Sequence, residues 1–152
     1  MIPVMIRSAK AADIPQIMHL ERQCPSAAHW TEQQYKYLFQ DPDRLLLVSE
    51  SQNADSGISG FLIAHQVAPE WELENVVISP TSRRKGLGTR FLQALFTSAR
   101  EAKSKAIFLE VRESNAPARL LYENAGFQQA SRRKAYYFNP EEDAIVYRKI
   151  LR

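Results

Sequence analysis

The sequence predicts a mixed α/β fold in which a central, mostly antiparallel sheet is flanked by helices. Three observations support this prediction. Apolar segments of strand length and amphipathic segments of helical periodicity alternate along the chain. Three strand-like segments follow one another between residues 45 and 78, which predicts an antiparallel meander. A strand–helix–strand succession then follows, which implies a right-handed crossover and local parallel pairing.

The first half of the chain is predicted to hold a short strand, two helices and three longer strands. Ile14 and Ile17 place an apolar stripe on the first helix. Thr31 begins the second helix, because Gln34 three residues later completes a capping box. Residues 51–60 are rich in Ser and Gly and predict a hairpin loop. In chain order, these elements are expected at residues 4–7, 12–23, 31 onward, 45–50, 58–66 and 71–78.

The second half is predicted to alternate helix, strand and helix before two final strands. Phe91 and Leu95 recur at helical spacing in the clearest helix of the sequence. Asn115 is a typical N-cap for the next helix, and Gly126 is a typical residue for its end. In chain order, these elements are expected at residues 87–102, 106–111, 116–125, 127–133 and 143–150.

Length and composition exclude several classes of protein. The 152 residues fit a single domain over 1–152, and 45% hydrophobic with 24% charged residues excludes a disordered or collagen-like chain. No apolar run approaches the ~20 residues that span a bilayer, and no secretory signal is evident. Cys24 is a single cysteine, so an internal disulfide and a Cys-based zinc site are excluded. We expect a cytoplasmic protein without a metal.

Charge is distributed unevenly along the chain. Residues 1–80 hold five Lys/Arg against ten Asp/Glu, whereas residues 81–152 hold fifteen against seven. A basic half is typical of proteins with an anionic partner, such as nucleic acid or a phosphorylated cofactor, but also of a solvated surface.

The tightest basic cluster lies in a turn between a predicted strand and the clearest helix. The first turn of a helix has unpaired N–H groups and a partial positive charge, so it receives anions. Glycines there let the backbone approach a phosphate closely, and cations and a hydroxyl add to the attraction. A Walker A loop and a GxGxxG motif are both absent, so we predict a different pyrophosphate site. Its residues are Arg83, Arg84, Lys85, Gly86, Leu87, Gly88 and Thr89.

A second group of residues has the types that acyl transfer to an amine requires. Glu110 at a strand end suits the base that takes the amine proton, since an ammonium has no lone pair. Tyr122 suits the acid that protonates a departing thiolate. The competing interpretations are that Glu110 is a solvated partner of Arg112 and that Tyr122 is a core aromatic.

These motifs resemble those of the GNAT acetyltransferase superfamily, and within it the bacterial ribosomal-protein-alanine N-acetyltransferases. The turn matches the acyl-CoA loop as Arg83-x-x-Gly86-x-Gly88, and NVVISPTSRRKGLG is similar to the family's cofactor strand and loop. The closest likeness is LEVRESNAPARLLYENAGF at residues 109–127, followed by Arg132-Arg133-Lys134-Ala135-Tyr136-Tyr137. The likeness spans residues 28–150 in order and implies the GNAT fold.

The resemblance implies a role for each matching residue. Glu110 would accept the amine proton and Tyr122 would protonate the thiolate of acetyl-CoA. The cofactor would also be held by the loop at residues 83–89, by Asn115 and by the strand residues Val76, Val77 and Ile78. The acceptor would contact Trp30, Glu72, Tyr136 and Tyr137.

The acceptor is expected to be a protein N-terminus, of the ribosomal-protein alanine type, attacking directly in a ternary complex. An α-amine has a pKa of about 8 against ~10.4 for Lys, so a carboxylate base deprotonates it more easily. Glu72 and Glu74 share one strand face and would attract a cationic acceptor, and either could share the base role. The alternatives are a small-molecule amine acetyltransferase and a non-catalytic acyl-CoA-binding module.

Two further interpretations are disfavoured. Nucleic acid would call for basic residues spread with aromatics across a face, whereas here they gather on the phosphate turn. A route through acetylated Cys24 is disfavoured, because this residue is remote in sequence from the other groups and has no nearby His. The oligomeric state stays open.

Overall fold

The computed structural model describes residues 4–24, 29–51 and 57–152. Its strands are β1 (Val4–Ser8), β2 (Arg44–Ser51), β3 (Ile58–Val67), β4 (Glu70–Ile78), β5 (Ala106–Arg112), β6 (Gln128–Tyr137) and β7 (Glu142–Ile150). Its helices are α1 (Ile14–Arg22), α2 (Glu32–Gln40), α3 (Leu87–Glu101) and α4 (Ala116–Asn124), with 3-10 turns η1 (Ala11–Asp13) and η2 (Pro80–Ser82). The expected order of strands and helices is confirmed. Residues 52–56, half of the predicted 51–60 loop, lie outside the described residues, and residues 58–60 belong to β3.

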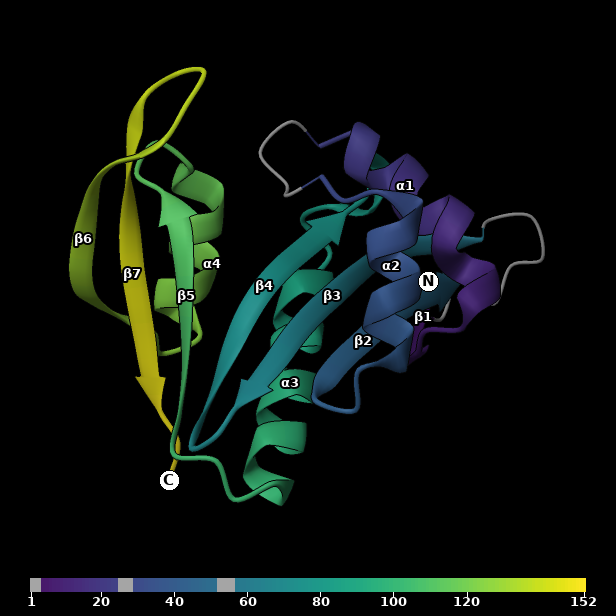
Figure 1. Ribbon diagram of the computed structural model, residues 1–152, viewed down its shortest axis with the longest axis horizontal. Helices are drawn as coiled ribbons and strands as arrows, with labels where there is room; N and C mark the ends of the chain where they lie inside the picture. The colour runs from purple at the N-terminus through teal and green to yellow at the C-terminus, as the bar shows by residue number, and fades with distance from the viewer. Residues whose placement is uncertain (1–3, 25–28, 52–56) are drawn as a thin grey trace.

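The seven strands form one mixed sheet in the order β1-β2-β3-β4-β5-β7-β6 (Figure 1). β4 and β5 pair in parallel, and every other neighbouring pair is antiparallel. The last strand, β7, lies between β5 and β6, which precede it in the chain. The prediction of a mostly antiparallel sheet with one parallel crossover is therefore confirmed.

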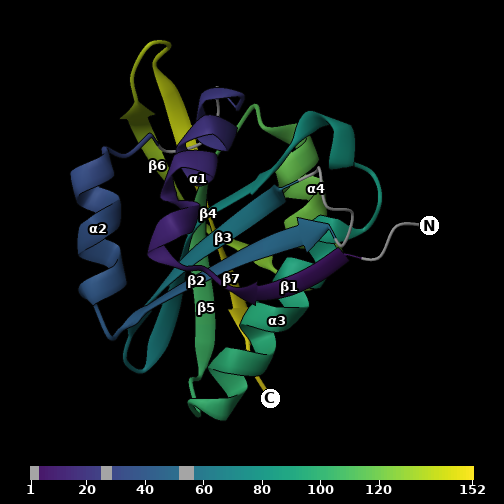
Figure 2. The ribbon, with the colours of Figure 1, turned by 90° about the vertical axis from the view of Figure 1, so that its right-hand side faces the viewer.

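Helices cover both faces of the sheet (Figures 1 and 2). α1 and α2 lie over β2 and β3, where Ile17, Tyr35 and Phe61 are buried together. α3 and α4 lie on the opposite face, and α3 buries Phe91 and Leu95 in the larger core. No helix in the described part of the chain is long and apolar enough to cross a membrane.

A bulge in β4 changes the direction of its side chains. Leu73 pairs with Ala64 and Asn75 pairs with Ile63, so Glu74 has no partner residue on β3. Before the bulge, Leu73 belongs to the core beneath α3, whereas after it Val77 belongs to the core beneath α1 and α2. Bulges of this kind bend a strand and increase its twist.

β4 and β5 pair over a short stretch and then separate. Their parallel pairing runs from Glu70 opposite Ala106 to Leu73 opposite Leu109 and stops at the bulge. Figure 1 shows the two strands meeting at the bottom of the view and parting toward the top. Among the described residues, no strand therefore pairs with the β5 side of β4 beyond Leu73.

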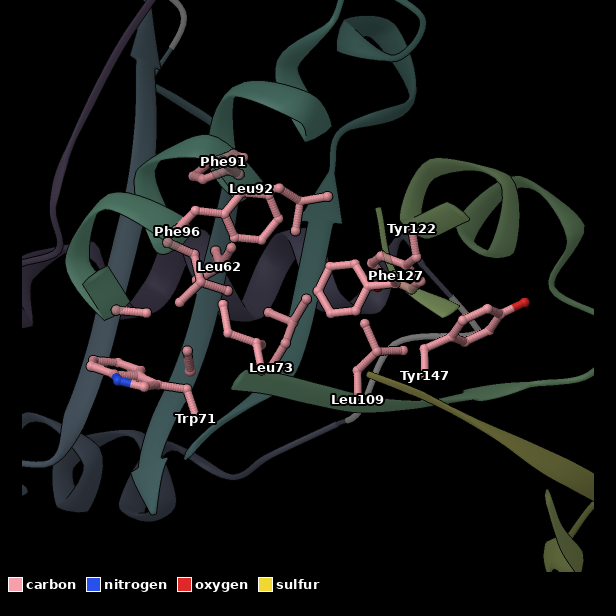
Figure 3. Packing of buried hydrophobic residues seen from close by; sticks show 14 of the residues in the cluster. Leu62, Trp71, Leu73, Phe91, Leu92, Phe96, Leu109, Tyr122, Phe127 and Tyr147 are labelled. Carbon is pink, nitrogen blue, oxygen red and sulfur yellow. The ribbon is translucent and has the colours of Figure 1, made fainter. Parts of the chain in front are cut away.

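A row of aromatic rings spans the two halves of the sheet behind this split (Figure 3). The Phe127 ring lies 5.9 Å from Phe96 of α3 and 5.8 Å from Tyr122 of α4, measured between centroids. Tyr122 in turn lies 6.4 Å from Tyr147 of β7. Side-chain packing thus connects the halves where strand pairing does not.

Candidate active site

The separation of β4 from β5 leaves a cleft of about 270 Å³. Residues from β4, β5 and α4 form most of its walls, and Tyr137 of β6 and Cys24 after α1 complete it. It is lined by Leu73, Glu74, Asn75, Val76, Leu109, Glu110, Val111, Arg112, Asn115, Ala118 and Tyr122. The structure thereby brings Glu110, Asn115 and Tyr122 into one hollow.

Glu110 lies near the end of β5 and turns a mostly buried side chain into the cleft, with 16% of it exposed. Its Oε1 lies 3.3 Å from Nε of Arg133, an arginine of β6 whose side chain is 56% exposed. Hydrogen bonding to the Glu110 carboxylate, with its charge, raises the pKa of Tyr136. The predicted partner Arg112 instead binds Glu142 at 3.1 Å. Arg133 lies in the RRKAYY segment at residues 132–137, but the sequence does not indicate that it contacts Glu110.

Tyr122 lies on the buried side of α4, and 9% of the residue is exposed. Burial, and then the charge of Tyr137, raise its pKa, so the hydroxyl keeps its proton at neutral pH. Its ring packs edge-on against Phe127 and it also lines the cleft. Tyr122 is therefore a core aromatic that also lines the cleft, and its role as an acid stays a prediction.

Asn115 caps α4 as its sequence position predicts. Its side-chain oxygen accepts a hydrogen bond from the backbone N–H of Ala118 at 3.3 Å. The side-chain oxygen of Asn115 is thus used for the cap, and the residue lines the cleft at the start of α4.

The three predicted cofactor residues of β4 differ in where they lie. Val76 lines the cleft, whereas the Val77 side chain is buried on the other face. Val76, Val77 and Ile78 pair with β3 on one edge, so their remaining backbone groups face the side where β5 has parted. An extended chain could pair there as an added strand does.

The predicted pyrophosphate loop is an exposed turn that leads into α3. Gly86 is the N-cap with φ of +79°, and Arg84 has φ of +63°. A Cβ built on Gly86 would meet no atom within 4 Å, whereas one on Gly88 would lie 3.1 Å from Leu121 of α4. A side chain at position 88 would thus press on Leu121 of α4, a packing contact that the motif did not reveal.

The remaining loop residues divide between surface and core. The side chains of Arg84 and Lys85 are exposed, as is Thr89 in the first helical turn. Arg83 is also exposed, and its Nε donates to the carbonyl of Ile78 at 3.1 Å. Leu87 is buried in the core, so only its backbone is available to a ligand.

The two predicted acceptor tyrosines lie at a bulge in β6. Arg133 opposes Ala144 and Tyr137 opposes Glu142, so β6 holds two more residues than β7 here. The rings of Tyr136 and Tyr137 pack edge-on at 5.1 Å. Burial raises the pKa of Tyr137 to about 12. Tyr137 lines the cleft, and Tyr136 lies outside it beside Arg133.

An acidic group lies next to the cleft on the face of β4 opposite α3. Glu72 and Glu74 do share this face, and their carboxylates lie within 4.8 Å of His65 of β3 and of each other. Burial is the largest cause that raises the pKa of each, and the charge of Glu110 adds to it for Glu72. Nε of Arg44 lies 3.0 Å from Oε1 of Glu74, although neither atom has an aligned hydrogen bond. The guanidinium of Arg44 thus supplies a positive charge next to the carboxylates of Glu72 and Glu74.

Trp30 is not in the cleft. It lines a second hollow of about 360 Å³ against α2, together with Tyr37 and Arg44. Because Arg44 also contacts Glu74 of the cleft wall, the two hollows meet across this ion pair.

Cys24 lies closer to the site than its sequence position indicates. It follows α1, yet it lines the same cleft as Glu110. Cleft residues on distant segments have no local sequence signal, because the sheet brings them together only through long-range pairing.

Comparison with known proteins gives concordant results. The model described as "Acetyltransferase (GNAT) family" matches residues 14–127. The chain is 33% identical over 143 residues to the ribosomal protein bS18-alanine N-acetyltransferase of Escherichia coli K12, with 93% of each chain covered. The crystal structure of the ribosomal-protein-S18-alanine N-acetyltransferase from Escherichia coli gives a TM-score of 0.85 at 30% identity, covering 98% of this chain and 94% of that chain.

A more distant structure shares the fold. Arabidopsis thaliana NAA60 in complex with acetyl-CoA gives a TM-score of 0.90 at 13% identity, with 98% of this chain and 99% of that chain covered. The expectation of this fold is confirmed.

Proposed function

Because the chain belongs to the GNAT acetyltransferase family, we propose that it transfers an acetyl group from acetyl-CoA to the α-amine of a protein N-terminus, of the ribosomal-protein alanine type. The observation that carries this proposal is the convergence of Glu110, Asn115 and Tyr122 in one cleft beside the unpaired edge of β4. The nature of the acceptor rests on the bS18-alanine enzyme, which is similar over 93% of both chains.

The residues present fit acetyl-CoA. An exposed turn with three cations and the first-turn amides of α3 suit a pyrophosphate. The free edge of β4 at residues 74–78 suits an extended arm that carries amide groups, and it leads from that turn to the cleft. Acetyl-CoA supplies an activated thioester, and the protein supplies position, a base and an acid.

Glu110 and Tyr122 then have complementary tasks. Glu110 accepts a proton from the acceptor ammonium, directly or through a water, and frees the nitrogen lone pair for attack on the thioester carbonyl. A C–N bond forms as the C–S bond breaks. Tyr122 donates its proton to the departing sulfur, which leaves as the thiol of CoA.

The rest of the acceptor would extend away from the base. The hollow beside Trp30 and Tyr37 borders the cleft at the ion pair of Arg44 and Glu74, and the acceptor would run from one to the other. Such a route suits a polypeptide better than a compact amine, because only a chain would occupy both hollows.

A substrate panel tests the acceptor. Purified protein is given acetyl-CoA with N-terminal alanine peptides, lysine peptides with blocked N-termini, and polyamines, and free CoA is measured. We expect the highest kcat/KM with the alanine peptides. Preference for a polyamine would contradict the proposal, and lack of turnover with every amine would indicate a binding module.

Direct transfer of the acetyl group also predicts that Cys24 is not needed for turnover. If both substrates must be bound together, initial-rate plots intersect and Cys24→Ser keeps wild-type turnover. Parallel plots, together with protein labelled by acetyl-CoA alone, would instead indicate an acetyl-cysteine route. The position of Cys24 in the cleft makes this experiment informative.

A further inference from the structure

The side chain of Arg133 forms an ion pair with Glu110, the proposed base. Its Nε lies 3.3 Å from Oε1 of Glu110, and its guanidinium carbon lies 5.2 Å from the centre of the Tyr136 ring. The proposed acceptor is itself a cation when it arrives, because an α-amine with a pKa near 8 is mostly protonated at neutral pH. Two cations therefore compete for one carboxylate.

Sheet register explains how Arg133 reaches Glu110 from two strands away. Glu110 opposes Val146 of β7, and Arg133 opposes Ala144 of the same strand. Directly opposed residues in antiparallel strands point to the same face, and so do residues two apart on one strand. Arg133 thus lies on the Glu110 face and extends over β7, where the small side chain of Ala144 leaves room.

Glu72 belongs to the same arrangement. It opposes Phe108 on β5, which lies two residues before Glu110, so both carboxylates are on one face. Burial, and then the negative charge of Glu110, raise the pKa of Glu72, whereas the charges of His65, Arg44 and Arg133 lower it. Arg133 therefore offsets the mutual repulsion of two acidic side chains while no substrate cation is present.

The contact is suited to exchange. The Arg133 side chain is 56% exposed, whereas that of Glu110 is 16% exposed. Exposed ion pairs contribute little net free energy, so a second cation can displace the guanidinium at small cost. In Figure 1, α1 and α2 lie over β2 and β3, away from β5, which carries Glu110, and from β6, which carries Arg133.

We propose that Arg133 is a stand-in for the acceptor ammonium: it occupies Glu110 while no substrate is bound, and it competes with the protonated amine but not with the uncharged acetylated product. This inference rests on the proposed function. The incoming ammonium replaces the guanidinium on Glu110. Once acetylated, the amide nitrogen carries no charge, so Arg133 returns to Glu110 and the product is no longer held there.

The test measures peptide binding and turnover for Arg133→Met. An alanine-initiated peptide and its N-acetylated counterpart are titrated by calorimetry in the presence of CoA, and kcat and KM are measured with acetyl-CoA. We expect the free-amine peptide to bind about two- to fivefold more tightly, the range set by a weak exposed ion pair, with KM lowered alike. We expect kcat to be unchanged within about twofold, because the wild-type protein has already released Arg133 when chemistry begins.

Matched variants isolate the effect. Lys134→Met removes the same charge one residue along the strand and should leave both affinities unchanged. Arg133→Lys keeps the charge and should behave like the wild type. Arg133→Gln serves as a second neutral variant with a polar side chain and should repeat the effect of Arg133→Met.

Several results would overturn the proposal. A tenfold loss of kcat without a lower KM would make Arg133 a residue that positions Glu110 for catalysis. Equal changes for the two peptides, or no change for either, would show that charge competition is absent. A wild-type protein that does not acetylate the peptide α-amine would reject the proposed function as well, which distinguishes the two failures.

Discussion

Glu110 and Tyr122 enter the cleft from different elements, and their surroundings differ in a way that a mutation series can separate. Glu110 comes from a strand end and borders charged groups, whereas Tyr122 comes from a helix and is packed among aromatic rings. Substitution of either should therefore leave different signatures in rate and stability.

Glu110→Gln keeps the shape of the side chain and removes the proton acceptor. We expect kcat to fall by about 10²–10⁴-fold, the usual effect of losing a general base. CoA affinity should be retained. Glu113→Gln is the matched control, because Glu113 is a nearby glutamate that binds Arg132 instead. Wild-type kinetics in Glu110→Gln would assign Glu110 a structural role.

Tyr122→Phe removes a hydroxyl while the ring packing stays. We expect turnover to fall with little change in melting temperature, and acetyl-CoA affinity to fall less than turnover, because the interaction matters most as charge develops on sulfur.

Tyr147→Phe should show the reverse pattern. Its hydroxyl donates to Glu123 at 2.7 Å and accepts from Arg119 at 2.9 Å. Loss of these bonds should cost about 1–3 kcal/mol of unfolding free energy and leave kcat near wild type. Rates and thermal melts of both variants provide the comparison, and a fully active Tyr122→Phe would mean that the hydroxyl is idle.

Sequence predicts single residues well when their partners are local. Thr31 and Gln34 form the predicted capping box, and Asn115 caps α4 as expected. The pair of Glu110 and Arg133 was not predicted, because it depends on a third strand that lies between them. Such a contact follows from sheet register, which no local pattern specifies.

At the level of elements, the turn before α3 and the end of α4 both depend on a glycine with positive φ. Gly86 has φ of +79° and Gly126 has φ of +99°. Each should lose about 1–2 kcal/mol of stability when replaced by Ala, because L-residues are strained there.

Only one of these glycines faces the proposed pyrophosphate site. We expect Gly86→Ala to weaken CoA binding about tenfold, which corresponds to ~1.4 kcal/mol. Gly126→Ala is the control for backbone strain and should keep wild-type CoA affinity. Calorimetric titration of CoA into both variants measures the difference. Equal CoA affinities of the two variants would show that the loop at residues 83–89 is not part of the CoA site.

Irregularities in the strands could not be predicted from their apolar patterns. Alternation at residues 71–78 indicates a regular strand, yet Glu74 forms a bulge and the two halves of β4 bury opposite faces. The predicted strand at 127–133 continues to Tyr137 through a second bulge. A bulge depends on the partner strand, so the sequence of one strand does not reveal it.

At the level of the whole molecule, the split between β4 and β5 means that a ligand in the cleft contacts both halves of the sheet. At 100 times its dissociation constant, CoA should add about 2.7 kcal/mol to the unfolding free energy. We expect the melting temperature to rise by about 5–10 °C. Gly86→Ala should show a smaller rise at the same CoA concentration. An unchanged melting temperature in the wild type would contradict binding.

The order of elements could be predicted from sequence, but the order of strands in the sheet could not. A meander and a crossover are visible as successions of apolar segments. The insertion of β7 between β5 and β6 leaves no such trace, because the connection from β6 to β7 looks like that of any hairpin.

This insertion has a consequence for protein synthesis. β7 follows the other six described strands in the chain, yet it separates β5 from β6. While the ribosome still holds residues 142–150, a nascent chain has β5 with an open edge and β6 with no neighbour. Arg133 cannot yet be placed over Glu110, and Tyr147 cannot join the aromatic row. The proposed site therefore assembles only after β7 has left the ribosome.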